Sequence, residues 1–533
     1  MAVSGVKLQG RCDGSPEGTG LFSKNRFLAA VLTLALLAAG GILLSCGGVG
    51  GSSNPVGPPP VAAPLAQADV GNIVQAVAQS AQQPMVIAVA DRAGGILAIF
   101  VTQPSAPATG LGNFDQSEDA QELAVALART AAFFSNDQAP LSTRTVRFIS
   151  GIHFPPGVAG TASGDLYGIE NTNRGCPLNT AYLPGKTLTP ARSIDGSTTG
   201  LGIMTGKADV LDSDPTAVNP GGIPIFKNGF AVGGVGVVST SNAVAEYAAF
   251  AGATNAGFLP SPDQLPPPGV VIVGGIALPF VNQTTPPASV TPGPNPGTYV
   301  QGPTNGTLPP DGLLAGPSAG SGGLTQSDVQ TIISQAVATA EITRAVIRLP
   351  QSSRTRMTIA VADLDGTILG LHRMPDGTMF SADVAVAKAR NVIWFSGGGS
   401  ADLPEIPAGT AVTNRTIGFG AQPLFPPGID GSGPGPFFSL YQFDTATPCT
   451  QGSDVSNPPN HSGVVFFPGS LPLYKNGVLV GGLGVSGDGV DQDDYVTYNG
   501  AIGFLPPQAI DADNVVIDGV RMPFLKFPRN PLN

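Results

Sequence analysis

The chain repeats itself, and this repeat constrains its architecture more than any other sequence feature. Three segments near the start of the chain return in the same order near its end. They are residues 65–74, 87–91 and 224–237, which match residues 324–333, 359–363 and 472–485. The spacing between matching segments is far longer than the period of about 20 to 50 residues that is typical of a solenoid. The sequence therefore predicts two homologous domains, one for each copy of the repeat.

The first 45 residues have the pattern of an export signal. Basic residues precede an uncharged apolar run, Phe27 to Leu44, and Leu-Leu-Ser stands directly before Cys46. A basic start, an apolar centre and a small residue before the cut are typical of a secretory signal peptide. The ending resembles the bacterial lipobox, which implies cleavage before Cys46 and lipidation of its thiol. We therefore expect a lipoprotein of the cell envelope, in the outer membrane facing the periplasm or the surface.

An uncleaved membrane anchor is the alternative interpretation of the same run, because about 18 apolar residues can just cross a bilayer. Residues 46–64, rich in Gly, Ser and Pro, are expected to be a flexible tether. A second Pro/Gly/Ser-rich stretch, residues 281–323, is expected to link the two copies. The remaining units, residues 65–280 and 324–533, have about 210 residues each and are long enough to bury a core.

Composition excludes some partners. The net charge is −11 with a pI near 4.7, and no run of Lys or Arg stands out. Nucleic acid is therefore an unexpected partner. Only 11% of the residues are charged, while 73 are Gly and 52 are Pro. This composition is more typical of an exported, loop-rich protein than of a cytosolic helical enzyme.

The four cysteines have different predicted roles. Cys12 lies in the signal and Cys46 is the lipidation site, whereas Cys176 and Cys449 occupy matching places in the two copies. Because an exported compartment permits disulfides, one bridge can join the copies. Two unbridged cysteines inherited by duplication are the alternative. The chain has no Cys-x-x-Cys, which argues against zinc, a thioredoxin-like site and covalent c-type haem.

The second copy gives the clearer secondary structure. Thr325 and Asp328 fit a capping box, and apolar residues at helical spacing follow from Val329. Asp-Gly and Asn-Gly turns between apolar runs predict two hairpins. The expected elements are a helix from 325, strands at 357–361 and 367–371, a helix at 381–395, strands at 471–474 and 478–485, a helix at 491–498 capped by Asp491, and a strand pair within 515–524. Hairpins make an antiparallel sheet, so the predicted fold class is α+β with helices packed on each sheet.

Each copy also carries a stretch that is unusually long for a loop. These stretches are residues 136–220 and 397–468, and both contain Arg-Thr-Val/Ile, at Arg144 and Arg415, followed by Phe-Pro-Pro-Gly. Since the two copies share these motifs, we expect ordered insertions.

Several motifs of the second copy together resemble the GlcG/HbpS-like haem-binding family. They are Ile-Ala-Val-Ala-Asp363 with a following Gly, Arg373-Met-x-Asp-Gly, a helix with Lys388-Ala-Arg, and a strand with Gly481-Gly-x-Gly. The resemblance covers most of the second copy and the helix, strands and hairpin of the first. It implies a profilin-like fold, frequent homo-oligomers and, for some members, binding of haem or a related small ligand.

The resemblance directs attention to one group of residues in the second copy. Imidazole and thioether groups are haem ligands, and arginine can pair with a propionate. The candidate residues for non-covalent haem b are His372, with iron as its metal, and Arg373, Met374, Asp376 and Lys388. A surface histidine on an edge strand is the alternative for His372. We expect His461 to lie in a solvated loop, and His153 has no visible partner.

The first copy lacks these groups, since Phe100, Val101 and Thr102 stand in place of the His-Arg-Met run and Leu127 in place of Lys388. Haem is therefore expected in the second copy only, at one per chain. The isolated motifs Gly482-x-Gly-x-x-Gly and Gly316-x-Ser-x-Gly match a dinucleotide fingerprint and a nucleophile elbow by spelling but lie in the wrong context. The acidic run from 488 to 494 lacks the spacing of an EF-hand loop.

Two functions remain open from the sequence. The first is an envelope-anchored lipoprotein that binds a ligand, with haem as the leading ligand. The second is a structural or assembly module whose two copies form an intramolecular pseudo-dimer without a small ligand. No paired carboxylates, histidine cluster or Ser/His/Asp set stands out, so the sequence favours a role other than catalysis.

Overall fold

The computed structural model describes residues 61–102, 105–178, 193–196, 200–259, 271–288, 290–456 and 458–533. The expected signal peptide, Cys46 and most of the tether lie outside these ranges. Among the described residues, none of the helices combines the length and apolar character needed to cross a bilayer.

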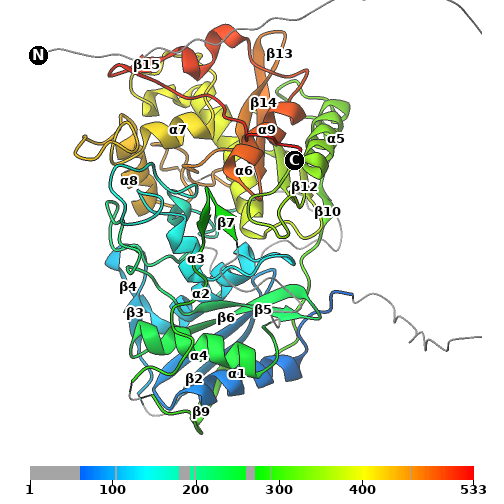
Figure 1. Cartoon of the computed structure of the whole chain (residues 1–533). Helices are drawn as coiled ribbons and strands as arrows, with labels where there is room; N and C mark the ends of the chain where they lie inside the picture. The colour runs from blue at the N-terminus through cyan, green and yellow to red at the C-terminus, as the bar shows by residue number, and fades with distance from the viewer. Residues whose placement is uncertain are drawn as a thin grey trace, which may run out of the picture. The chain divides into compact units, whose positions relative to one another are not determined.

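The N-terminal half, residues 65–280, provides four strands of an antiparallel sheet whose strand order is β5-β6-β1-β2-β9, and the edge strand β9 comes from the stretch that follows it. Helices α1 and α4 lie side by side on one face of this sheet and α2 covers the other (Figure 1). The helices are α1 (Gln67–Ser80), α2 (Ala120–Phe134) and α4 (Asn242–Asn255), and the strands are β1 (Met85–Asp91), β2 (Ile96–Thr102), β5 (Gly222–Lys227), β6 (Phe230–Ser239) and β9 (Gly297–Gln301). Two small ribbons, β3 (Thr109–Leu111) with β4 (Ser117–Asp119) and β7 (Ile272–Val273) with β8 (Ile276–Ala277), lie outside the main sheet.

The C-terminal half, residues 324–533, provides four strands of a second sheet with the corresponding strand order, β10-β12-β11-β14-β13, and the edge strand β10 comes from the stretch that precedes it. Helices α5 and α9 pack on one face of its sheet and α6 on the other. The helices are α5 (Gln326–Ile342), α6 (Phe380–Ser396) and α9 (Val490–Gly500), and the strands are β10 (Gly312–Ala315), β11 (Thr358–Ala362), β12 (Ile368–Arg373), β13 (Ser470–Lys475) and β14 (Val478–Ser486). The predicted α+β class, with two antiparallel sheets packed against helices, is therefore confirmed.

The Gly-Gly-x-Gly run of β14 allows α6 to lie directly on the sheet. A Cβ atom at Gly482 would collide with the carbonyl oxygen of Ala389, and one at Gly484 would collide with that of Ala385. Glycine is thus required where the backbones of helix and strand approach each other closely. This packing role accounts for the motif and leaves nothing that requires a dinucleotide.

Most helix caps and hairpins predicted from short sequence patterns are present in the structure. Thr325 and Asp328 form the predicted capping box, and both predicted hairpins of the C-terminal half are present. At the tip of the β13–β14 hairpin, Asn476 and Gly477 both have positive φ, as a two-residue turn of this type requires. The closing strands β15 (Val516–Ile517) and β16 (Val520–Arg521) form a separate ribbon instead of joining the main sheet.

The prediction that Asp491 caps α9 is wrong. This helix follows Gly489 and has no side-chain cap. The Asp491 carboxylate instead lies 2.7 Å from the Arg415 guanidinium and 2.8 Å from the Lys526 ammonium group. Charge pairing with the insertion and the C-terminal segment therefore explains this acidic residue.

The stretch from 281 to 323 is more than a connection. It contributes the edge strand β9 to the first sheet and the edge strand β10 to the second. After each strand the chain turns back to the aspartate that ends the Ile-Ala-Val-Ala-Asp motif. The carboxylate of Asp91 accepts the N–H of Thr307 at 3.0 Å, and that of Asp363 accepts the N–H of Ser321 at 2.6 Å.

The long insertions are ordered where the structure describes them. They hold the short helices α3 (Thr143–Phe148), α7 (Asn414–Gly420) and α8 (Phe438–Ala446). Arg144 of α3 pairs with Glu246 of α4 at 2.6 Å, and Arg415 of α7 pairs with Asp494 of α9. The shared Arg-Thr motif therefore ties each insertion to a helix of its own half.

The two insertions also meet each other. Tyr167 stacks on Tyr441 with ring centroids 5.0 Å apart, and Asn171 accepts a hydrogen bond from Thr445 at 3.2 Å. Contact between matching residues is the pattern expected at a two-fold axis. Elsewhere the halves join non-matching residues, such as Phe134 and Phe380, whose rings stack 4.1 Å apart. The two-fold pattern is therefore local to the insertions.

Candidate functional site

His372 and Arg373 are neighbours on β12, so their side chains point to opposite faces of the sheet. His372 is half-buried, opposite Ile359, on the face that α5 covers. Burial lowers the pKa of His372, against the opposing influence of Asp311 and Glu341. The edge-strand alternative for this histidine is wrong, because β12 lies between β10 and β11.

Arg373 and Met374 are both buried and engaged with the backbone. The Arg373 guanidinium donates to the carbonyl oxygen of Pro310 at 3.1 Å and to that of Gly377. The Met374 sulfur accepts the N–H of Met357 at 3.4 Å. Both side chains thus have backbone partners, which lie just before β10, just before β11 and in the loop after β12.

Asp376 joins the two halves. Its carboxylate lies 2.5 Å from Arg92 of the N-terminal half and 2.5 Å from Arg348 of its own half. Burial would raise the pKa of Asp376, but the two guanidinium groups outweigh burial and hold it below its usual value. Burial and the charge of Asp376 raise the pKa of nearby Asp137 to about 6. The group is therefore a charged contact between the halves.

Lys388 is fully buried in α6. Its ammonium group lies 3.0 Å from Asp493 of α9 and donates to the carbonyl oxygen of Val485 at 2.9 Å. Burial lowers the pKa of Lys388 and raises that of Asp493 to about 7. The structure thus does not bring the five predicted residues together at one site. His372 and Arg373 lie on opposite faces of the sheet, Asp376 lies between the two halves, and Lys388 forms a buried ion pair. A haem role for them stays a prediction.

A cleft of about 690 Å³ opens in the C-terminal half at the C-terminal end of α6. We call it the Trp394 cleft. The β11–β12 turn, the end of α6, the long insertion and the β13–β14 hairpin each contribute to its lining. The lining residues are Leu364, Asp365, Gly366, Arg390, Ile393, Trp394, Gly397, Gly398, Gln451, Asn460, His461, Val478 and Leu479.

Trp394, the only tryptophan of the chain, is held in a fixed orientation. Its indole N–H donates to the carboxylate of Asp402 at 3.0 Å. The ring of His461 stands edge-on to the indole, with centroids 5.8 Å apart and an interplanar angle of 73°. Two aromatic side chains from separate segments therefore form one corner of the cleft.

His461 and Gln451 both carry polar atoms without partners among the described residues. The Nδ1 atom of His461 has no hydrogen-bond partner, and its Nε2 atom lies 3.9 Å from Asp454, beyond hydrogen-bond distance. Both amide atoms of Gln451, which is 2% exposed, also lack partners. Burial lowers the pKa of His461, which favours neutral imidazole. Unpaired buried polar groups are costly, so both side chains would gain stability from a polar partner.

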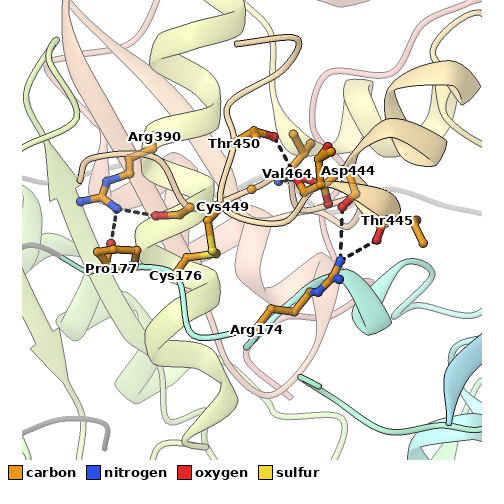
Figure 2. Close-up of a disulfide and its surroundings, with 12 residues drawn as sticks. Arg174, Cys176, Pro177, Arg390, Asp444, Thr445, Cys449, Thr450 and Val464 are labelled. Atoms are coloured by element: carbon orange, nitrogen blue, oxygen red, sulfur yellow. Dashed lines mark hydrogen bonds between the residues drawn. A yellow bond between two sulfur atoms is a disulfide. The ribbon is translucent and has the colours of Figure 1, made fainter. Parts of the chain in front are cut away.

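A disulfide holds the insertion of the C-terminal half beside the Trp394 cleft. Cys176 and Cys449 are bonded, and their Cα atoms are 5.0 Å apart. Figure 2 shows one arginine on each side of the bridge: Arg174 donates to the carbonyl oxygen of Thr445 at 2.8 Å, and Arg390 donates to that of Pro177 at 3.0 Å. The segment that carries Gln451 and His461 is therefore anchored to the N-terminal half where it begins.

The corresponding surface of the N-terminal half is covered. Phe133, at the end of α2, is the sequence match of Trp394 and is 1% exposed. Its carbonyl oxygen accepts the N–H of Met379 at 3.0 Å, close to the Arg92–Asp376 pair. The C-terminal half thus covers the surface of the N-terminal half that corresponds to the Trp394 cleft.

Comparison with known proteins agrees with the resemblance of the C-terminal half. The family model "Haem degrading protein HbpS-like" matches residues 324–501. Residues 324–501 are an HbpS-like domain. The matched region includes all the residues that line the Trp394 cleft. No ligand-binding residue is assigned by the match itself.

The curated relatives are corrinoid adenosyltransferases PduO from Salmonella typhimurium and Citrobacter freundii. Each is 28% identical over 153 residues, which is 29% of this chain and 33% of the relative. The chain therefore spans about a third of the length of these relatives.

Three solved structures are similar at 20% identity. The first, the Klebsiella pneumoniae protein ORFY, has a TM-score of 0.22, and the match covers 33% of this chain and 88% of that one. The second, a PduOC–haem complex, has a TM-score of 0.23, with 34% of this chain and 94% of that one covered. The third, a double mutant of Streptomyces reticuli HbpS, has a TM-score of 0.21, with 37% of this chain and 97% of that one covered.

Sequence reasoning did not identify the residues of the Trp394 cleft. The expectation of a solvated loop at His461 is wrong, since its side chain is only 12% exposed. His153 also has partners: Thr161 at 2.8 Å and Asp430 at 3.3 Å. One signal in the sequence could have pointed to the cleft: Trp394 stands where the first copy has Phe133, at the end of the matching helix. However, no local pattern links this helix with the residues of the insertion about 60 positions further on.

Proposed function

We propose that the chain is an envelope-anchored lipoprotein that binds haem non-covalently through its C-terminal half. The observation that carries the proposal is the match of residues 324–501 to the HbpS-like family. A related protein, PduOC, forms a complex with haem. The same half holds a cleft of about 690 Å³ with an imidazole in its wall, which suits a group whose iron takes imidazole as an axial ligand.

The proposal assigns the N-terminal half to a supporting role, with one haem per chain. The N-terminal half has a single histidine, His153, whose ring nitrogens already lie 2.8 Å from Thr161 and 3.3 Å from Asp430. The surface around Phe133 is also covered by the other half. Both observations favour a single binding site.

Titration of the mature chain with hemin tests this proposal. The chain is extracted in detergent and hemin is added in steps while the Soret band is recorded. We expect a band that saturates at one hemin per chain. Saturation at two would contradict the supporting role of the N-terminal half, and no band would contradict haem binding as a whole.

An assembly module is the second candidate function. Stacking of Tyr167 on Tyr441 and the Cys176–Cys449 bridge favour it, because matching residues of the repeat meet within one chain. In this case the halves form an intramolecular pseudo-dimer of duplicated domains. The absence of hemin binding, together with a monomeric mass in analytical ultracentrifugation, would favour this function.

A further inference from the structure

We infer that the Trp394 cleft is the haem site of this chain and that His461 provides the iron ligand. This inference rests on the proposed haem-binding function and names its site. His461 belongs to the long insertion between α6 and β13 and not to the motifs on which the family resemblance is based.

The cleft has a suitable size and suitable walls. Small-molecule sites usually have volumes of about 300 to 1,000 Å³ and are mostly apolar, with a few polar groups that orient the ligand. The Trp394 cleft, at about 690 Å³, lies within this range. Apolar surface comes from residues such as Ile393, Trp394 and Leu479. The polar lining residues are Asp365, Arg390, Gln451, Asn460 and His461. A flat, largely apolar ligand with a metal centre fits this distribution.

His461 is the histidine that is least committed within the described residues. His153 has a hydrogen-bond partner for one ring nitrogen and Asp430 near the other. His372 lies on a central strand under α5 and does not line the cleft. Among the described residues, the Nδ1 atom of His461 has no hydrogen-bond partner, and its Nε2 atom lies 3.9 Å from Asp454, beyond hydrogen-bond distance. An imidazole nitrogen that is not engaged in a hydrogen bond can bind iron.

The arginine of the cleft is already engaged. Arg390 donates to the carbonyl oxygens of Gly366 at 2.9 Å, Pro177 at 3.0 Å and Leu178 at 2.8 Å. These bonds hold the cleft walls together and leave Arg390 poorly placed to pair with a propionate. We therefore expect the propionates of the bound haem to point to solvent at the open side of the cleft.

Two variants of the mature chain address the site directly. His461→Gln removes the imidazole but keeps a polar side chain. Gly398→Phe places a ring at the cleft, where a Cβ atom meets nothing within 4 Å and φ is not in the left-handed region. Their matched controls are His372→Gln and Gly433→Phe, the second at another glycine whose Cβ would meet nothing within 4 Å.

We expect both cleft variants to weaken hemin binding by at least about tenfold, which corresponds to about 1.4 kcal/mol, while both controls bind like the wild type. Metal-free protoporphyrin IX separates the two effects. It should bind to His461→Gln as to the wild type, because no iron is present, but more weakly to Gly398→Phe. Circular dichroism and thermal unfolding establish that each variant is folded.

Unchanged hemin binding in both cleft variants, with a loss in His372→Gln, would overturn the assignment to the cleft and leave haem binding by this half intact. Loss of hemin binding in Gly398→Phe alone would overturn the role of His461 and retain the cleft. A wild-type chain that takes up no hemin would remove the proposed function and this inference together.

Discussion

Lys388 shows how one position can be charged in one half and apolar in the other. In the C-terminal half it forms a fully buried ion pair with Asp493. The matching residues of the N-terminal half are Leu127 and Ala245, so both charges are absent there together. Removing one partner of a buried pair leaves an uncompensated charge, whereas replacing both by apolar residues is often neutral. The N-terminal half therefore provides a natural model for replacing the pair.

Lys388→Leu alone should lower the free energy of unfolding by about 3 to 5 kcal/mol, because Asp493 stays buried without its partner. The double variant Lys388→Leu with Asp493→Ala should recover most of this loss. Unfolding by denaturant, followed by circular dichroism, measures both. A double variant no more stable than the single one would contradict a simple pair. If the double variant also binds hemin normally, Lys388 has a structural role and does not bind the ligand.

Residue roles could be predicted from the sequence only where their partners are near in the chain. The capping box of Thr325 and Asp328 spans three residues and was found. The role of Asp376 was not found, because one of its partners, Arg92, is 284 residues away. The same limit applies to Asp491, whose partner Arg415 lies in the insertion. A charged residue at the start of a helix is compatible with capping and with pairing, and only the tertiary structure decides between them.

At the scale of elements, the hairpins and main helices follow from local rules of turn chemistry and helical spacing. The edge strands β9 and β10 do not, because they lie in a stretch whose Pro, Gly and Ser content indicates a linker. Each is short and pairs with a distant strand: Tyr299 lies opposite Phe100, and Leu313 lies opposite His372. Edge strands tolerate such composition, since one of their sides has no strand to pair with.

The disulfide gives a prediction about the insertions. Replacing both Cys176 and Cys449 by Ser should lower stability by as much as about 5 kcal/mol in the chain-entropy model, because the bridge closes a loop with a sequence separation of 273. It should also weaken hemin binding, since Cys449 anchors the segment that carries Gln451 and His461. Denaturant unfolding and hemin titration measure the two effects. Reduction of the wild-type chain is the control and should give the same changes.

Stability that falls without any change in hemin affinity would show that the insertion wall does not need the bridge. Unchanged stability would instead mean that the many contacts between the insertions, such as the stacking of Tyr167 on Tyr441, are sufficient without the covalent bond.

For the whole molecule, the two halves share a strand order but differ in what they leave accessible. The C-terminal half places Asp376 and Met379 against the end of α2 in the N-terminal half, and its own corresponding region remains open as the Trp394 cleft. In return, the N-terminal half supplies Cys176 and the carbonyl groups of Pro177 and Leu178, which hold the wall of this cleft. The N-terminal half therefore supports the site that we propose in the C-terminal half, which is consistent with one ligand per chain.

The predicted lipid anchor at Cys46 gives a testable prediction of where this molecule is located. Two or three acyl chains contribute about 0.8 kcal/mol per buried methylene, enough for firm attachment. We expect the wild-type chain to be found in the membrane fraction and to incorporate labelled palmitate. Cys46→Ser should abolish the labelling and prevent cleavage of the signal, so the chain should keep its full length. Its hemin binding should be unchanged, because Cys46 lies far along the chain from the C-terminal half.

Cys12→Ser is the matched control, since Cys12 precedes the apolar run within the predicted signal. It should be labelled, cleaved and fractionated like the wild type. If Cys46→Ser is processed and labelled like the control, the thiol of Cys46 is not the lipidation site and the lipobox interpretation is wrong. An unlabelled wild-type chain that stays uncleaved in the membrane would instead favour the alternative, a single membrane anchor formed by Phe27 to Leu44.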